Sequence, residues 1–401
     1  MATPRRGATP RRGATPRIGA TPRIGIDVTS ALTQGGGIGR YTRELVHALA
    51  ALEHGAELTL FSARPPARLP VGDPLPQASN IRHRPAPLAE QWLYRLWYRL
   101  RLPLPVQLVT GSLDLFHSPD FVLPPVSGGI PTLLTVHDLS FVHYPDTFPG
   151  VLVDYLNRVV TWSIGRASHI LADSLATRQD LVNVWDVDAA RITVLYSGVS
   201  ERFRRIEDKI ILTATREKYG LGHAPYLLSV GTVQPRKNYQ MLIKAFAPVA
   251  QQQPHVLAIA GGKGWLAEEM AAEIARQGLQ ERVRFIGFVD DDDLPALYSA
   301  ADLFVFPSLY EGFGLPLLEA MACGVPVLSS DTSSLPEVAG DAALLLPPRA
   351  QETWTQAMLD LLQQEDKRKA HIEKGLAQVA HFSWGRAAQQ LLDIYDDLLQ
   401  K

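Results

Sequence analysis

Two glutamates eight positions apart are the residues of this sequence best placed to do chemistry. Glu311 and Glu319 lie in SLYEGFGLPLLEAMACGV, where two glycines and Pro316 separate them. Because glycine and proline are unfavourable inside a helix, we expect a loop that carries Glu311, followed by a helix with Pro316 at its first position and Glu319 in its opening turn. Such a loop offers backbone N–H groups and a positive helix end to an anion. The carboxylates would accept hydrogen bonds from hydroxyls, one on a sugar ring and one on a ribose. Two solvated acids beside a tight turn are the simpler alternative.

A basic pair forms the second candidate. In SVGTVQPRKNYQMLIKAF, Arg236 and Lys237 follow an apolar strand and precede Asn238, which we expect to cap a helix. A guanidinium can bind two phosphate oxygens at once, and a lysine ammonium acts as a point charge. The pair therefore suits a pyrophosphate group, with an exposed basic turn as the alternative.

A glycine-rich loop follows the first predicted strand, RIGIDVT. In QGGGIGRY, residues 34–41, four glycines precede a helix that is indicated by apolar residues at helical spacing. Glycines at such a turn let the backbone approach a ligand closely. The nicotinamide fingerprint Gly-x-Gly-x-x-Gly does not fit, because its third glycine, counted from Gly37, would be Thr42. The second strand, ELTLFS, also lacks the terminal acid that would bind a ribose. A glycine loop without a ligand remains an alternative.

Two histidines lie in predicted strands. His137 and Asp138 end the apolar strand PTLLTVHD, and His117 lies in DLFHSP. A histidine at the carboxyl end of a strand can hydrogen-bond a sugar hydroxyl. We favour this role for His137, with a structural histidine as the alternative, and we favour the structural role for His117.

An acidic run, Asp290–Asp293, resembles a metal-binding Asp-x-Asp motif. It follows a predicted strand, VRFIGFV, and precedes LPALYSAAD. We therefore interpret its acids as the cap and first turn of a helix, and we expect no metal site.

The segment QWLYRLWYRLRLP combines aromatic and basic residues. Trp92, Leu93, Leu96, Trp97 and Leu100 would form one face of a helix over residues 91–103, with arginines on another. Such a helix could lie on an anionic membrane. We favour burial in the first domain, or a place in an acceptor groove.

Length and composition indicate an ordinary globular protein with two domains. The chain has 401 residues, 46% of them hydrophobic, and a net charge of −2 that gives no general attraction to nucleic acid. Cys323 is the single cysteine, so no internal disulfide can form, and we expect it to be a packed side chain. No apolar run reaches the length of a membrane span, and the N-terminus lacks the core of a secretory signal. We expect a cytoplasmic protein, with at most peripheral contact with the inner membrane face.

Strands alternate with helices from residue 23 onward, which is typical of parallel α/β domains. Before that point the sequence repeats the hexamers ATPRRG and ATPRIG, which predicts a disordered basic tail. The predicted parts are a tail (1–22), a Rossmann-like acceptor domain (23–200), a linker (201–224), a Rossmann-like donor domain (225–383) and a C-terminal helix that packs back on the first domain (384–401). Ligands of such sheets bind outside the carboxyl ends of the strands, and two facing domains would leave a cleft between them.

Together these residues resemble the retaining glycosyltransferases of family 4, which have the GT-B fold. The likeness covers nearly the whole chain after residue 22. Its most specific part is EGFG with Glu319, followed by EAMACGVPVLSSD; GTVQPRKN and YSGVSERF add to it.

The resemblance implies roles for individual residues. Glu311 would lie beside the donor sugar, and Glu319 would bind the ribose hydroxyls. Arg236 and Lys237 would hold the pyrophosphate, and His137 would lie near the reacting sugar. Backbone contacts with the donor are implied for a further set: Gly37, Gly312, Phe313, Gly314 and Leu315. One departure is Thr232, where many relatives carry an arginine, so the phosphate contacts here depend on Arg236 and Lys237.

The resemblance also implies an activity. The chain would transfer a sugar from a nucleotide-diphosphate donor to a glycan or lipid-linked acceptor, with retained configuration and without a metal or other cofactor. The HDLSF and PRKN segments look most like those of bacterial mannosyltransferases that use GDP-mannose in polysaccharide or glycolipid synthesis. A nucleotide-sugar-binding protein without turnover is the alternative from another functional class.

Overall fold

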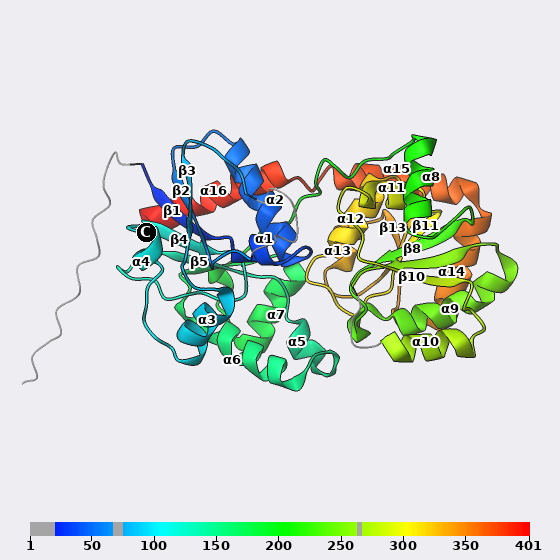
Figure 1. The fold of residues 1–401 in the computed structure, drawn as a ribbon, viewed down its shortest axis with the longest axis horizontal. Helices are drawn as coiled ribbons and strands as arrows, with labels where there is room; N and C mark the ends of the chain where they lie inside the picture. Colours follow the sequence, from blue (N-terminus) through cyan, green and yellow to red (C-terminus); the bar gives the residue numbers. More distant parts are fainter. Residues whose placement is uncertain (1–20, 67–74, 263–266) are drawn as a thin grey trace, which may run out of the picture. The chain divides into compact units, whose positions relative to one another are not determined.

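The computed structural model describes residues 21–66, 75–262 and 267–401 (Figure 1). The chain divides into two compact units. The first comprises Met1–Leu134, Ser163–His169 and Leu391–Lys401, and the second comprises Thr135–Trp162 and Ile170–Gln390. The predicted tail lies almost wholly outside the described residues. The predicted domain boundaries stay a prediction.

The first sheet has seven strands in the order β3-β2-β1-β4-β5-β6-β7. Its strands are short apolar runs whose inner members are buried on both faces, as expected when helices cover a parallel sheet. The strands are β1 (Arg23–Asp27), β2 (Glu57–Ser62), β3 (Ile81–Pro85), β4 (Leu115–Ser118), β5 (Thr132–Val136), β6 (His169–Ala172) and β7 (Ile192–Val194).

The second sheet has six strands in the order β10-β9-β8-β11-β12-β13, and all its neighbouring strands are parallel. They are β8 (Tyr226–Val230), β9 (Val256–Ala260), β10 (Val283–Gly287), β11 (Leu303–Phe306), β12 (Val327–Ser330) and β13 (Ala343–Leu346).

The helices connect these strands and cover the sheets. The α-helices are α1 (Thr29–Thr33), α2 (Ile38–Ala51), α3 (Glu90–Tyr94), α4 (Gln107–Thr110), α5 (Ser140–His143), α6 (Gly150–Arg166), α7 (Leu175–Trp185), α8 (Lys209–Lys218), α9 (Tyr239–Gln252), α10 (Ala267–Arg276), α11 (Leu294–Ser299), α12 (Leu315–Ala322), α13 (Leu335–Ala339), α14 (Gln351–Gln363), α15 (Glu365–Val379) and α16 (Trp384–Gln400). A π-turn, η1 (Arg95–Arg99), and three 3₁₀ turns, η2 (Pro145–Thr147), η3 (Ala189–Arg191) and η4 (Pro235–Lys237), complete the set.

Successive side chains of β8 pack against helices on opposite faces of the second sheet. Tyr226 and Leu228 belong to a core cluster with residues of α11 and α12, whereas Leu227 belongs to the opposite cluster with residues of α9, α10 and α14. Successive side chains of a strand point to opposite faces, so an apolar run fills both cores at once. Figure 1 shows α11 and α12 on one side of these strands and α9 and α10 on the other.

All the strands predicted from the sequence are present, and two strands were missed. β3 is an edge strand of sequence IRHRP with four exposed residues, so it has no apolar run or alternation to reveal it. β13, of sequence ALLL, is an edge strand of the second sheet.

The prediction of one helix over residues 91–103 was wrong. The chain forms the short helix α3 and then the π-turn η1. A π-turn adds a residue to the turn and rotates the following side chains away from the expected face. Leu93 and Trp97 are buried, but Trp92 and Leu100 are 49% and 62% exposed, so the five residues do not share one face.

Two further expectations concern buried side chains. His117 is fully buried, and its Nδ1 lies 2.8 Å from the Tyr395 hydroxyl of α16, in agreement with a structural role. Cys323 is buried, and burial raises the pKa of its thiol to about 12, as expected of a packed side chain. Within the described ranges, no helix is long and apolar enough to cross a membrane.

Candidate functional site

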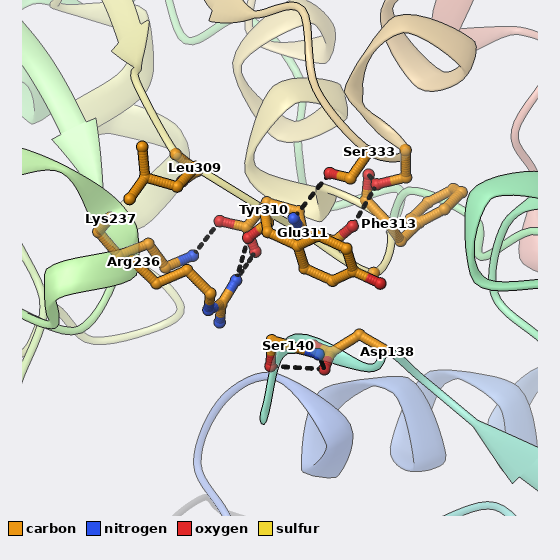
Figure 2. A network of polar contacts seen from close by, with 12 residues as sticks. Asp138, Ser140, Arg236, Lys237, Leu309, Tyr310, Glu311, Phe313 and Ser333 are labelled. Atoms are coloured by element: carbon orange, nitrogen blue, oxygen red, sulfur yellow. Dashed lines mark hydrogen bonds and ion pairs between the residues drawn. The ribbon is translucent and has the colours of Figure 1, made fainter. Parts of the chain in front are cut away.

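The loop between β11 and α12 carries Glu311 (Figure 2). Gly314 precedes the helix with a φ of +112°, a conformation that favours glycine. The helix begins at Leu315, so Pro316 is its second residue and Glu319 lies beyond the first turn. The helix therefore begins one residue before the predicted start at Pro316, and Glu319 lies after the first turn instead of within it.

Four consecutive backbone N–H groups of this loop have no acceptor among the described residues. They belong to Gly312, Phe313, Gly314 and Leu315. The neighbouring groups are occupied, because Glu311 N donates to Ser333 Oγ, and Ser334 Oγ donates to the carbonyls of Glu311 and Phe313. The two serines thus fix the loop and leave its N–H groups at the positive end of α12, where an anion is favoured.

Glu311 binds both members of the basic pair. Its Oε1 accepts from Lys237 Nζ at 2.6 Å, and its Oε2 accepts from Arg236 Nη1 at 2.8 Å (Figure 2). All three side chains are nearly buried, with about a tenth of each exposed. Burial alone would raise the pKa of Glu311, but the charges of Arg236 and Lys237 lower it to about 2. The carboxylate is therefore a fixed anion within a cluster of net charge +1.

The two cations keep donors beyond those that Glu311 uses. Arg236 Nε is buried without a partner among the described residues, while Arg236 Nη1 also donates to the carbonyl of Tyr310. Lys237 Nζ has three N–H donors and uses one for Glu311, and it lies 5.0 Å from the centre of the Phe306 ring. Burial lowers the pKa of Lys237, although Glu311 opposes this shift. The cluster can therefore accept a further anion.

The basic pair is held in the 3₁₀ turn η4, directly before α9. Asn238 occupies the position before the helix, but it has a left-handed backbone and makes no side-chain cap bond. Its Nδ2 instead donates to the carbonyls of Pro307 and Pro348. Asn238 therefore holds the predicted N-cap position of α9, but its amide ties the basic turn to the start of the Glu311 loop and does not cap the helix.

His137 follows β5 and pairs with an acid that the sequence did not reveal. Its Nδ1 lies 2.7 Å from Asp173 Oδ2, and both side chains are buried. Burial raises the pKa of Asp173, and the charge of His137 opposes that shift. The other oxygen, Asp173 Oδ1, is buried without a partner among the residues described. Asp173 thus fixes the orientation of the imidazole.

Gly312 lies against the backbone that follows β5. A Cβ at Gly312 would lie 2.1 Å from the carbonyl oxygen of His137, so only glycine fits here. Thr177 Oγ1 donates to the carbonyl of His137 and lies 3.4 Å from that of Gly312. This close approach brings the His137 segment and the Glu311 loop into one site within the second unit.

Tyr310 connects the same two segments through its hydroxyl. The hydroxyl donates to Asp180 Oδ2 at 2.5 Å and accepts from the Leu139 N–H at 3.3 Å. Asp180 Oδ1 also lies 3.0 Å from His143 Nε2. Asp138 instead accepts from Ser140 N and Oγ, which closes the turn after β5 (Figure 2).

The side chains of two residues predicted to bind the donor are buried in the core. Glu319 is 2% exposed, and its Oε2 accepts from the Tyr298 hydroxyl at 2.9 Å. The Phe313 ring packs against Tyr196 and Phe382, so only its backbone faces the loop. The ribose contact of Glu319 stays a prediction.

The remaining candidates lie outside this cluster. Gly37, in the first unit, precedes α2 with a φ of +50° and has open space where a Cβ would be. The short helix α1 stands between β1 and this loop, which the sequence did not indicate. The predicted backbone contact of Gly37 with the donor stays a prediction.

Asp290–Asp293 do not form the predicted first turn of a helix. α11 begins at Leu294, and no side chain caps it. Lys218 Nζ instead binds Asp290 at 2.8 Å and Asp293 at 2.6 Å. Among the described residues, no group of three or more His, Cys, Asp or Glu side chains is arranged to hold a metal ion.

Sequence reasoning missed Asp173, Tyr310, Ser333 and Ser334. Asp173 directly follows β6 as His137 directly follows β5, and this was a usable signal. Its pairing with His137 requires the order of strands in the sheet. The serines have no such signal, because their role depends on a turn at Ser333 with a φ of +51°.

Comparison with known proteins finds two family models. "Glycosyltransferase Family 4" matches residues 35–203, and "Glycosyl transferases group 1" matches residues 213–378. O-antigen chain mannosyltransferase B of Escherichia coli is 34% identical over 372 residues, which are 90% of this chain and 95% of that protein. O-antigen chain mannosyltransferase RfbU of Salmonella typhimurium is 28% identical over 275 residues, 69% of this chain and 71% of that protein. Sucrose-phosphate synthase from Thermosynechococcus elongatus has a similar structure, with a TM-score of 0.73 at 22% identity over 94% of this chain and 99% of that chain.

Proposed function

The chain belongs to the family 4, group 1 glycosyltransferases, and from this premise we propose that it transfers mannose from GDP-mannose to a glycan or lipid-linked acceptor. Its two Rossmann-like sheets form the GT-B fold that the sequence predicts. We further propose that the reaction retains the anomeric configuration and needs no metal ion. Mannose is favoured because O-antigen chain mannosyltransferase B, at 34% identity, aligns over nearly its whole length.

One observation carries this proposal. Four N–H groups without acceptors and two buried cations with spare donors meet at the Glu311 loop. A diphosphate matches both, because its oxygens accept hydrogen bonds and its negative charge exceeds the net +1 of the cluster. The N–H groups would bind one phosphate, and Arg236 and Lys237 would bind the other.

The chemistry follows from where charge develops. When the bond between the anomeric carbon and the diphosphate oxygen breaks, negative charge grows on the diphosphate and the sugar ring becomes cation-like. Donors that are already fixed stabilise this charge without reorganisation, and the loss of one typically slows a reaction by about 10²–10³-fold. Arg236 and Lys237 would thus supply the charge that a metal ion supplies in other transferases.

Glu311 and His137 have different roles in this account. Glu311 holds both cations through its two oxygens, and its remaining lone pairs can accept from a sugar hydroxyl. Asp173 binds His137 Nδ1 and orients the imidazole, which would lie near the reacting sugar. In a retaining reaction without a protein nucleophile, the acceptor attacks the same face that the diphosphate leaves.

The decisive variant removes the cations. Arg236→Ala with Lys237→Ala should abolish mannosyl transfer, measured with labelled GDP-mannose in the presence of EDTA. The matched control is Arg204→Ala with Lys209→Ala, which removes the same charge from exposed positions of the same unit. Near-normal turnover in the first variant, or an activity in the wild type that appears only with added metal, would contradict the proposal.

We also propose a peripheral membrane contact through residues 91–113. This segment contains no Asp or Glu. It exposes Trp92, Leu100, Leu102, Leu104 and Leu108, together with Arg95, Arg99 and Arg101. Exposed apolar residues with cations and without acids favour an anionic lipid surface.

Vesicle flotation tests this contact. The wild type should float with vesicles that contain phosphatidylglycerol and remain behind with purely zwitterionic vesicles. Trp92→Ala with Leu108→Ala should reduce flotation, whereas exposed Leu175→Ala should not. Equal recovery of all three proteins would exclude this segment as the contact.

A further inference from the structure

The first turn of helix α7 depends on a distant residue for two of its hydrogen bonds. The N–H groups at the start of a helix have no carbonyl partner within that helix. Ser174, directly after Asp173, satisfies one of them, because its Oγ accepts from Thr177 N at 3.0 Å. The N–H groups of Leu175 and Ala176 instead donate to a side chain that lies 162 and 161 positions later in the sequence. The local sequence therefore provides only part of the cap of α7.

The distant side chain is that of Glu337 in α13. Its Oε2 accepts from Leu175 N at 2.9 Å, and its Oε1 accepts from Ala176 N at 3.1 Å. Oε2 also accepts from the Tyr196 hydroxyl at 3.0 Å, and burial and the charge of Glu337 raise the pKa of Tyr196 to about 12. The dipole of α7 favours a carboxylate at this end of the helix. Glu337 thus fixes the first turn of α7 with both of its oxygens.

A purely local role does not explain these bonds. Ser334 and Glu337 have the spacing of a capping box, Ser-x-x-Glu, in which each side chain binds an N–H group of its own helix. Ser334 makes no such bond to α13, and its Oγ donates to the carbonyls of Glu311 and Phe313 instead. Glu337 likewise binds α7. The start of α13 therefore joins the Glu311 loop to α7.

The turn that Glu337 fixes also supports the segment that carries His137. Thr177 lies in this turn, and its Oγ1 donates to the carbonyl of His137 and lies 3.4 Å from the carbonyl oxygen of Gly312. Asp173, which binds the His137 imidazole, is two residues before the helix. The alignment of the imidazole with the loop that carries Gly312 therefore depends on how the first turn of α7 is held.

We propose that Glu337 is a positioning residue for the transfer reaction. By tying α7 to α13, it keeps the imidazole of His137 aligned with the Glu311 loop, where the diphosphate would bind. Its bonds are to α7 and Tyr196, so it acts through these groups and not on the substrate. The inference rests on the proposed function, since it assigns a part in that reaction. A role in stability alone is the alternative.

Steady-state kinetics on a graded series of variants test this role. Glu337→Ala removes both acceptors and should lower kcat by about 10-fold, within the range for a lost helix cap, while GDP affinity stays within about 2-fold. Glu337→Gln keeps one carbonyl acceptor and should recover part of the rate. Tyr196→Phe should lower kcat by about 2–5-fold. Adding it to Glu337→Ala should have no further effect, because both changes remove the same bond. The control is Glu352→Ala, which removes an exposed acid from the first turn of α14 in the same unit.

Hydrogen exchange separates positioning from a general loss of stability. In Glu337→Ala, exchange should become faster at residues 174–177 and stay unchanged in β8 and β11, two inner strands of the second sheet. The nitrogen NMR signals of the His137 ring should shift in Glu337→Ala and stay as in the wild type in Glu352→Ala. An unchanged kcat in Glu337→Ala would overturn the assignment. Faster exchange across the whole second unit, or a loss of GDP affinity as large as the loss of kcat, would also overturn it.

The two proposals can fail separately. If the wild type transfers no sugar from any nucleotide donor, the proposed function fails, but hydrogen exchange and the His137 ring signals still decide whether Glu337 positions this segment. If those signals and the exchange at residues 174–177 are the same in Glu337→Ala as in the wild type, the positioning role fails whatever the enzyme transfers.

Discussion

Glu311 in the second unit and Asp27 in the first are buried carboxylates with opposite surroundings. Each lies at or after the carboxyl end of a parallel strand, and burial alone would raise the pKa of both. Two cations hold the pKa of Glu311 at about 2, whereas neighbouring acids help to raise the pKa of Asp27 to about 7. The neighbours decide the function of such a carboxylate. One is a fixed anion that positions cations, and the other is a hydrogen-bonding group close to its ionisation point.

The largest effect on stability should come from removing the charge of Glu311. Glu311→Gln leaves Arg236 and Lys237 buried without their carboxylate, which typically costs about 3–5 kcal/mol. Because the pKa of Glu311 is lowered by folding, its contribution is present above its unfolded value of 4.5 and is lost as the pH falls toward 2. Urea unfolding at several pH values should therefore show that the difference in unfolding free energy between the wild type and Glu311→Gln becomes smaller below about pH 4.5. The exposed Glu281→Gln is the control, and equal stability of the two variants at pH 7 would refute the role of Glu311.

Removing the charge of Asp27 should have the opposite effect and stabilise the protein. Because folding raises the pKa of Asp27, its favourable contribution is present below its unfolded value of 3.8 and is lost as the pH rises through 7. Asp27→Asn should therefore stabilise the protein by about 2–4 kcal/mol at pH 8 and by little at pH 4. Urea unfolding at the two pH values measures this difference. Destabilisation at pH 8 would show that Asp27 has an unrecognised cationic partner.

A smaller effect is expected where a carboxylate positions another catalytic group. Asp173→Asn removes the anionic partner of His137 and should lower kcat by about 10–100-fold, the equivalent of one charged hydrogen bond. GDP binding should not change. The exposed Asp186→Asn of the same unit is the control. A loss of GDP affinity comparable to the loss of kcat would assign Asp173 a structural role.

The smallest effect should come from carboxylates in solvent. Asp290 is 65% exposed and pairs with a half-exposed Lys218. Water screens such a pair, so Asp290→Asn should leave both the melting temperature and the rate unchanged within error. The rates of this variant and of the wild type should also remain equal when magnesium is added. A rate that depends on Asp290 and on magnesium would revive the metal-binding interpretation of this acidic run.

The sequence predicts the strands of both sheets and the main parts of the donor site. The inner strands are apolar runs between turn residues, so they can be recognised without the structure. Glu311, Arg236 and Lys237 are recognisable because glycine, proline and charge stand next to such runs. The edge strand β3 escapes the same reasoning because it is polar, whereas the apolar run ALLL of β13 could have been recognised in the same way as the inner strands.

Contacts between distant segments could not be predicted from spacing. Glu311 binds residues 74 and 75 positions away, and the residue types alone suggested that acid and cations would bind separate parts of a ligand. The pairing of His137 with Asp173 depends on strand order, and the depth of Glu319 depends on where α12 begins. A pocket lined by Asp27, Phe61, Trp97 and Asp120 combines residues from three strand ends with a π-turn that has no sequence signal.

Calorimetric titration of GDP and GMP in the presence of EDTA shows whether the second unit recognises a diphosphate. If the Glu311 loop and the basic pair bind the diphosphate, GDP should bind at least about 10-fold more tightly than GMP, because one charge-assisted contact contributes about 1.5–3 kcal/mol. This preference should disappear in Arg236→Ala with Lys237→Ala and persist in Arg204→Ala with Lys209→Ala. Equal affinity of the wild type for GDP and GMP, or a preference that survives loss of the basic pair, would contradict the account.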